Sequence, residues 1–159
     1  MERAEVIETL YRALHEHDGE TMAGLYHPEA HFSDPVFPEL RGEEVGMMWR
    51  MLCERGKDLR VEASGIAVDG ERGKAHWEAY YTFSATGRSV HNIIDASFVF
   101  DGDQIVEHRD VFSLWRWSRQ ALGPMGLVLG WSPVVRGKIQ SQARKGLEMF
   151  IKARRASPG

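Results

Sequence analysis

The sequence contains a single cysteine, Cys53, among its 159 residues, so no disulfide can form within the chain. It also lacks a long apolar run, because the apolar segment 121–135 is interrupted by glycine and proline and is too short to span a membrane. The first ten residues carry charges where a secretion signal would have an apolar stretch. A chain without disulfides suits a reducing compartment, so we expect a cytoplasmic protein that is stabilised by packing alone.

Charge is distributed unevenly along the chain, although the formal net charge is only -3. Residues 1–114 contain 11 Lys and Arg against 22 Asp and Glu, whereas residues 115–159 contain 9 against 1. With 43% hydrophobic residues, a chain of this length can fill one hydrophobic core. We therefore expect one domain over residues 1–114, followed by a basic helical extension over residues 115–159 that packs on the same domain or on a partner subunit.

Hydrophobic periodicity is helical in the first third of the chain and twofold after it. Apolar residues at helical spacing predict one helix before Asp18, a short one from Glu20 to about Tyr26, and a third between Gly42 and Gly56. From Leu59 apolar residues alternate, with a change of phase near Ser64-Gly65 that is typical of a β-bulge. Three further strands are expected over Lys74–Ala85, Val90–Phe100 and Gln104–Leu114, and a last helix from about Val134 to Ala153.

This order of elements predicts an α+β fold. We expect three N-terminal helices to pack on a curved antiparallel sheet and to enclose one pocket, with a helical extension at the C-terminus. The three long strands form a meander if Thr86-Gly87 and Gly102-Asp103 are two-residue hairpin turns.

Two such turns would fix which residues face each other, and would place a row of polar side chains across the sheet. Glu78, Asp95 and Asp110 then lie side by side. The rows next to them hold His76, Ser97 and His108 on one side, and Tyr80, Ile93, Phe112, Thr82, His91 and Leu114 on the other. Three adjacent carboxylates cannot all ionise cheaply away from water, so such a row is a candidate for chemistry. The residues alone leave open a second interpretation, in which this row is the solvent-facing side of the sheet.

Several short motifs resemble a known superfamily. Phe32-Ser33-Asp34-Pro35, Ile93-Ile94-Asp95-Ala96 and Phe98–Gly102, in this order of helices and strands, resemble the nuclear transport factor two-like superfamily. The likeness covers residues 4–114 and is strongest to its ketosteroid isomerase-like and SnoaL-like branch. It implies a cone-shaped domain with the Asp95 face lining the pocket. The segments Val90–Asn92, His108–Asp110 and Leu114–Trp117 are similar to an uncharacterised SnoaL-like subgroup with a C-terminal extension.

In ketosteroid isomerases one aspartate moves a proton, while a tyrosine and a protonated aspartate stabilise an enolate oxygen. By position, the resemblance implies that Asp34 is the base and Asp95 the proton donor or oxyanion partner. Tyr11 lies one residue from the position expected for the tyrosine. His108 and Asp110 would tune this chemistry, and the substrate-binding residues would be Tyr11, Trp49, Glu78, Tyr80, His91 and Phe112.

We therefore expect an enzyme that uses general acid-base catalysis, of isomerase, cyclase or hydrolase type, on a mostly hydrophobic carbonyl or epoxide-like compound. No organic cofactor is expected, and no metal, because the histidines and carboxylates lack a recognised metal-binding spacing. The alternative is a binding protein that holds a small hydrophobic ligand in the same pocket without changing it.

The expected partner, besides the small hydrophobic ligand, is a second copy of the chain. The superfamily often forms homodimers through the outer sheet face, where we expect Trp77, Ile94 and Phe98. The tail combines tryptophans, including Trp131, with a basic helix and could contact an anionic membrane surface. Packing of the tail on the sheet or on a second subunit is the favoured expectation. No nucleic acid is expected, because no groove-reading motif accompanies the basic charge.

Overall fold

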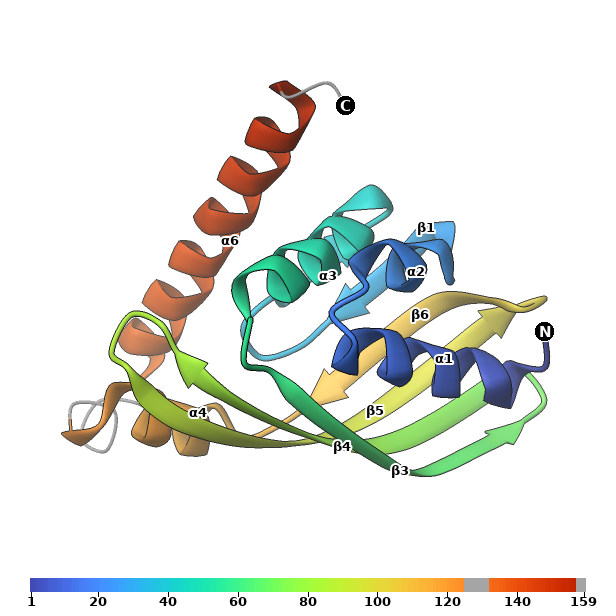
Figure 1. The fold of residues 1–159 in the computed structure, drawn as a ribbon, viewed down its shortest axis with the longest axis horizontal. Coiled ribbons are helices and arrows are strands. Elements are labelled where there is room, and N and C mark those ends of the chain that lie inside the picture. The colour runs from blue at the N-terminus through green and yellow to red at the C-terminus, as the bar shows by residue number, and fades with distance from the viewer. Residues whose placement is uncertain (125–131, 157–159) are drawn as a thin grey trace.

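The computed structural model describes residues 1–124 and 132–156 (Figure 1). Residues 125–131, which include Trp131 and much of the apolar segment 121–135, lie outside the described residues. Three N-terminal helices are present: α1 (Arg3–His15), α2 (Gly19–Gly24) and α3 (Glu43–Arg55). The apolar side chains that predicted α1 from their spacing are buried in the core, among them Val6, Ile7, Leu10 and Leu14.

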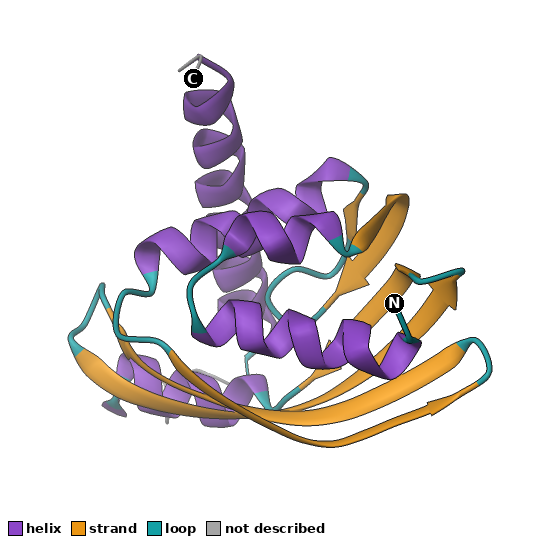
Figure 2. Cartoon of the chain, turned by 45° about the vertical axis from the view of Figure 1, so that its right-hand side comes forward, coloured by secondary structure: helices purple, strands orange, loops and turns teal. Residues whose placement is uncertain are grey.

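Six strands form one curved sheet beneath these helices, as Figure 2 shows. They are β1 (Tyr26–Ser33), β2 (Leu40–Arg41), β3 (Arg60–Asp69), β4 (Arg72–Phe83), β5 (Arg88–Asp101) and β6 (Gln104–Val111). Their order in the sheet is β2-β1-β6-β5-β4-β3. The α+β fold with a C-terminal helix is thus confirmed. The sheet is mixed rather than wholly antiparallel, because β1 pairs with β6 in parallel.

The bulge predicted in the first long strand is present. The register of β3 against β4 shifts between Ser64 and Ala67, and Gly65 has a φ of +62°, in the left-handed region that glycine tolerates. An extra residue in one strand bends it and increases its twist. This bend helps to curve the sheet around the helices.

The register of the two hairpins differs from the predicted one, and the difference matters for the site. Phe83 pairs with Arg88, so the β4–β5 turn has four residues rather than two. The β5–β6 turn has the expected two residues, with Asp101 opposite Gln104. Beyond it the register shifts by one, so that Phe100 faces Ile105 but Val99 faces Glu107. Because side chains alternate along a strand, this shift reverses the faces of β5 relative to β6.

Two predictions about the sheet faces are therefore wrong. Glu78, Asp95 and Asp110 do not form one row, because Glu78 faces Ile93, and Asp95 lies opposite His76 and Val111. Trp77, Ile94 and Phe98, expected on the outer face, are buried in the core on the helix side. The outer face of β4 and β5 carries His76, Glu78, Tyr80, His91 and Asp95 instead.

The C-terminal extension consists of two described helices, α4 (Leu114–Leu122) and α6 (Pro133–Ala156). The Ser113 side chain caps α4 by accepting a hydrogen bond from the backbone N–H of Arg116 at 3.1 Å. Trp117 and Ala121 of α4 pack with Val90 of β5 in a small second core. The extension therefore packs on the same chain, at the end of the long β4–β5 hairpin.

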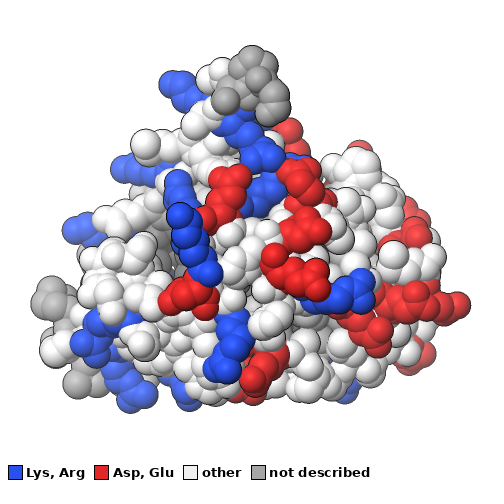
Figure 3. All heavy atoms as spheres, viewed as in Figure 1, with Lys and Arg blue, Asp and Glu red and all other residues white. Residues whose placement is uncertain are grey.

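Helix α6 lies against α3 through a row of ion pairs. Its arginines face acidic residues of α2 and α3: Arg144 pairs with Glu44 at 2.6 Å, Arg154 with Glu20 at 2.8 Å and Glu54 at 3.2 Å, and Arg155 with Glu43. Leu147 is fully buried beneath this row. Figure 3 shows the basic side chains along α6 beside the acidic ones of the N-terminal part. The opposite charges of the two parts of the chain thus meet within the molecule.

Among the helices that the structure describes, none is both long and apolar enough to cross a membrane.

Candidate active site

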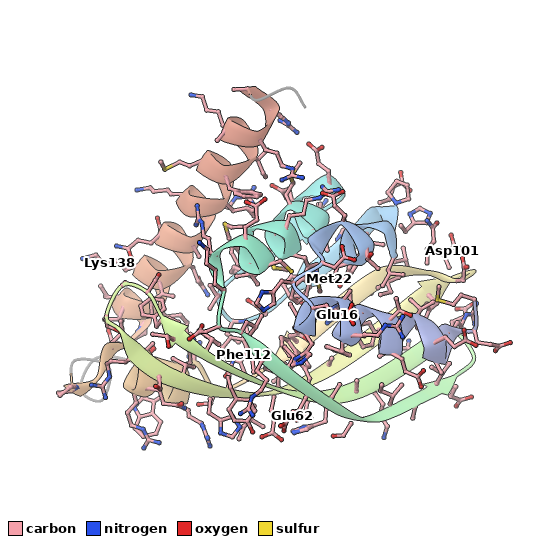
Figure 4. All side chains as sticks on the ribbon, in the orientation of Figure 1. Glu16, Met22, Glu62, Asp101, Phe112 and Lys138 are labelled. Carbon is pink, nitrogen blue, oxygen red and sulfur yellow. The ribbon has the colours of Figure 1, made fainter. Side chains whose placement is uncertain are left out.

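A cavity of about 340 Å³ lies between the concave face of the sheet and α3. Its walls are mostly apolar, and α4 contributes Trp117. Figure 4 shows Phe112 between the sheet and α3, whereas Glu62 points away on the outer face. The volume is in the range of sites for small organic ligands. Its main apolar walls are Leu14, Met48, Trp49, Met51, Leu59, Trp77, Ile94 and Phe112.

Asp34 is the first of two carboxyl groups that line this cavity. It follows the last residue of β1, and its Oδ1 accepts hydrogen bonds from the backbone N–H groups of Val36 (2.7 Å) and Phe37 (2.6 Å). Burial raises the pKa of Asp34 from 3.8 to about 7, and the negative charge of Asp110 adds to this shift. Hydrogen bonds from the two backbone amides oppose it but do not cancel it. Near neutral pH, Asp34 therefore exists in both protonation states.

Asp110 is the second carboxyl group, and it is only 3% exposed. Its Oδ1 accepts a hydrogen bond from His108 Nε2 at 2.8 Å and a longer one from Trp77 Nε1 at 3.4 Å. No hydrogen bond from the described part of the chain reaches its Oδ2. Asp110 thus has one oxygen held by N–H donors that stabilise a negative charge and a second oxygen free to meet a ligand.

A buried chain of hydrogen bonds leads to Asp110 from behind the cavity. Trp49 Nε1 donates to the hydroxyl of Tyr26 at 2.9 Å, and this hydroxyl lies 2.7 Å from His108 Nδ1. The direction of the bond between the Tyr26 hydroxyl and Nδ1 follows the tautomer of His108: with the histidine proton on Nε2, directed at Asp110, the tyrosine O–H donates to Nδ1. His108 is completely buried, and its contact with Asp110 orients the carboxyl group.

Other polar groups line the cavity at different places. Asn92 of β5 and Arg55 at the end of α3 both contribute to its wall. The hydroxyl of Tyr81 accepts a hydrogen bond from Trp117 Nε1 at 2.6 Å, which ties α4 to the sheet. The negative charge of Asp34 contributes to a raised pKa of Tyr81, although burial is the larger cause.

Comparison with known proteins shows the family of this chain. The model of the SnoaL-like domain matches residues 7–108, which is more than half of the chain. The chain belongs to the SnoaL-like domain family. No curated protein matches it in sequence.

Solved structures share the fold of this SnoaL-like domain at low sequence identity. An LEH-like epoxide hydrolase of M. tuberculosis is 19% identical, with a TM-score of 0.62 over 80% of this chain and 95% of that one. IdmH of Streptomyces antibioticus, described as a candidate polyketide cyclase, is 22% identical, with a TM-score of 0.63 over 76% and 98%. A protein from Catenulispora acidiphila with a ketosteroid isomerase-like fold is 13% identical, with a TM-score of 0.68 over 81% and 98%. At these identities the likeness shows the fold alone.

The cavity of the SnoaL-like domain brings together part of the residue set expected from the sequence. Asp34, Asp110, Trp49 and Phe112 all line it. His108 lies behind Asp110 and reaches the cavity only through it.

Tyr11 is buried beside the cavity and does not line it. Its ring packs on Trp77 with 5.4 Å between the centroids, and its hydroxyl has no hydrogen-bond partner in the described residues. Burial, with the charge of Asp110 as a second cause, raises the pKa of Tyr11 well above its ordinary value.

The remaining expected residues, Asp95, Glu78, His91 and Tyr80, lie on the outer face of the sheet, away from the cavity. The Asp95 side chain is 80% exposed and its Oδ1 is 2.9 Å from His76 Nδ1. His76 Nε2 is 3.0 Å from Glu78, whose other oxygen is 2.7 Å from His91 Nε2. These hydrogen bonds raise the pKa of His76, with the bond to Asp95 the largest cause and the bond to Glu78 next. Asp95 therefore cannot act on a ligand in this cavity, contrary to the expectation from the resemblance.

The sequence analysis missed Tyr26, Asn92 and Arg55 as residues of the site. It placed Trp77 on the outer face, although Trp77 belongs to the apolar series with Ala75, Ala79 and Tyr81 that marks the inner face of β4. The residues around the cavity include no metal-binding group, since the described part of the chain holds no cluster of three or more His, Cys, Asp or Glu suited to a metal ion.

Proposed function

We propose that this SnoaL-like domain is an enzyme that uses Asp34 and Asp110 as a general acid and a general base on a small, mostly hydrophobic substrate with a carbonyl or epoxide oxygen. The observation that carries the proposal is the unequal setting of two carboxyl groups in one apolar cavity. Asp34 retains a proton to about pH 7, whereas two N–H donors stabilise the charge of Asp110. A carboxyl group that keeps its proton near neutral pH, beside a second one whose oxygen is held by N–H donors, is suited to acid-base catalysis.

Asp34 is the acid in this scheme, which reverses the role implied by the resemblance. Its protonated form donates to the substrate oxygen as negative charge develops there. Its Oδ1 is occupied by two backbone N–H groups, so the proton resides on Oδ2.

Asp110 is the base, and His108 positions it. With a carbonyl substrate, Asp110 takes a proton from the neighbouring carbon while Asp34 gives its proton to the oxygen, which yields an enol. With an epoxide, Asp110 takes a proton from a water molecule whose oxygen bonds to a ring carbon, the ring C–O bond breaks, and Asp34 protonates the released oxygen. One molecule of water is then added, and a proton exchanged with solvent restores each carboxyl group.

The relatives support this substrate class without defining it. An epoxide hydrolase and a candidate polyketide cyclase share the fold, and both descriptions refer to chemistry on small organic molecules. The second candidate function is binding without turnover. It is favoured by the largely apolar lining of the cavity, in which the two carboxyl groups would only orient a ligand.

The test begins with mass spectrometry of small molecules extracted from natively purified protein. Any molecule found, together with styrene oxide, cyclohexene oxide and cyclic β,γ-unsaturated ketones, is then incubated with the wild type and with three variants. We expect Asp34→Asn and Asp110→Asn each to lower kcat/KM by roughly 10²- to 10⁴-fold, as loss of a general acid or base does.

Asp95→Asn is the matched control, since it removes a carboxylate from the outer face, and it should leave kcat/KM unchanged. Turnover by Asp34→Asn and Asp110→Asn at the wild-type rate would refute the acid-base scheme. A co-purified molecule that binds tightly and is never converted would favour the binding protein.

A further inference from the structure

The cavity has a cation at its wall that the acid-base scheme does not use. Arg55 is the only Lys or Arg among the described residues that line the cavity. It is the last residue of α3, and it is exposed to solvent. We propose that Arg55 binds an anionic oxygen group of the ligand, such as a carboxylate. The substrate would then be an amphiphile whose apolar body extends from Arg55 toward Asp34 and Asp110, a proposal that rests on the function proposed above.

Arg55 differs from the arginines around it in having no carboxylate partner. Arg50, five residues and more than one turn earlier in α3, pairs with Glu20 at 2.7 Å. The three acidic residues of α3 are taken by the arginines of α6. Arg55 makes no hydrogen bond or ion pair with any residue that the structure describes, so its donors are free for a ligand.

The Arg55 side chain contacts α6 without using its N–H donors. Its guanidinium carbon lies 5.9 Å from the centroid of the Phe150 ring on α6, within the range of a cation-π contact. This contact uses the face of the guanidinium and leaves the N–H groups at its edge available. A planar guanidinium held in this way matches the two oxygens of a carboxylate.

The cation and the acid pair act on different parts of the cavity. The raised pKa of Asp34 has no contribution from a nearby cation, so Arg55 does not neutralise it. Thr82 and Ser84 line the cavity where β4 ends. The backbone N–H of Thr82 donates to Asp58 just beyond α3, which places this end of β4 near the C-terminus of the helix. An anionic group is thus favoured at the Arg55 end and repelled by Asp110 at the other.

Equilibrium binding tests the proposal without depending on catalysis. The probes are naphthylacetate and naphthylacetamide, which have the same apolar ring system and differ in the charge of the polar end. Calorimetry at pH 7.5 gives the ratio of their dissociation constants for each variant. We expect the wild type to bind the anion roughly 10- to 100-fold more tightly than the amide, since hydrogen bonds to charged groups have effects of this size.

Arg55→Gln should abolish this preference, and Arg55→Lys should restore part of it. Lys57→Gln is the matched control, because Lys57 is an exposed cation two residues away that does not line the cavity, and its ratio should equal that of the wild type. Equal affinity of the wild type for both probes, or an unchanged ratio in Arg55→Gln, would overturn the proposal. If Arg55 only holds α6, Arg55→Gln would lower Tm and leave the ratio intact.

The same measurement separates this proposal from the acid-base scheme. In Asp34→Asn and Asp110→Asn the preference for the anion should persist, because Arg55 is unchanged. Absence of turnover with a normal binding ratio would reject the catalytic scheme alone. Normal turnover of the substrate panel with no anion preference would reject only the role of Arg55.

Discussion

The cost of keeping Asp34 in the cavity wall can be measured without knowing the substrate. Burial raises its pKa from 3.8 to about 7, because the folded protein favours the protonated form of Asp34 over the ionised form. Between these two pH values the folded state carries more protons than the unfolded state, and stability therefore falls as pH rises. Below about pH 4 both states are protonated and the effect is absent, and above about pH 7 it is complete.

The structure also gives the size of this effect. A shift of about three pKa units corresponds to roughly 4 kcal/mol, at 1.36 kcal/mol per unit. Asparagine at this position retains an oxygen that can accept the backbone N–H groups of Val36 and Phe37, and it cannot ionise. We therefore expect Asp34→Asn to stabilise the protein by about 2–4 kcal/mol at pH 8, and to have almost no effect at pH 4.

Urea unfolding of both proteins from pH 4 to pH 8 measures this difference directly. The matched control is Asp58→Asn, because hydrogen bonds from Thr82 lower the pKa of the exposed Asp58. Loss of a carboxylate stabilised in its charged form should reduce stability at neutral pH, so the control should shift in the opposite direction. A difference between wild type and Asp34→Asn that does not grow with pH would show that Asp34 has no raised pKa, and would remove the basis for its role as an acid.

Three further predictions concern the neighbours of the acid pair. If Asp34 acts as the acid, kcat/KM on an identified substrate should fall as pH rises through about 7, and a rate that rises over this range would contradict that role. Tyr11→Phe removes a buried hydroxyl without a partner in the described residues and should raise the free energy of unfolding by about 1 kcal/mol or leave it unchanged, so a clear loss in urea unfolding would reveal a hidden partner. Asp95→Asn should lower the pKa of His76, measurable by NMR titration, because it removes the largest cause of its upward shift; an unchanged titration would mean that the two groups do not interact in solution.

Most of the fold could be predicted because it depends on patterns repeated over many residues. The helical spacing of Val6, Leu10 and Leu14 and the alternation around Trp77 are both reproduced as buried faces. The parallel pairing of β1 with β6 could not be predicted, because it joins strands from the two ends of the domain and no local pattern encodes it.

The residues of the site depend on the pairing registers of the strands, which change with a single extra residue. The sequence alone did not predict these registers correctly. One extra residue in β6 put Asp95 on the outer face while Asp110 remained inside, whereas the four-residue turn after Phe83 shifted the pairing of β4 with β5 by two residues and left their faces unchanged. The inner face was nevertheless visible in the pattern, since Trp77, Tyr81, Ile94 and Phe98 are the apolar series of their strands, and burial of that series costs less than burial of Glu78 and Asp95. Asp34 was recognised correctly as a cavity residue because its turn motif is local. Arg55 and Asn92 carried no local signal, and only the folded chain brings them to the cavity wall.

The direction of the hydrogen bonds behind Asp110 has a consequence for where protons can travel. With the His108 proton on Nε2, each donor from Trp49 through Tyr26 to His108 points toward Asp110, and the series starts at an indole nitrogen, which does not give up its hydrogen as an acid. A proton taken up by Asp110 therefore cannot pass further into the protein interior along this series of hydrogen bonds. It can leave only to the bound molecule or to water that enters the cavity. The protein therefore offers no inward route by which Asp110 could lose this proton while a ligand fills the cavity.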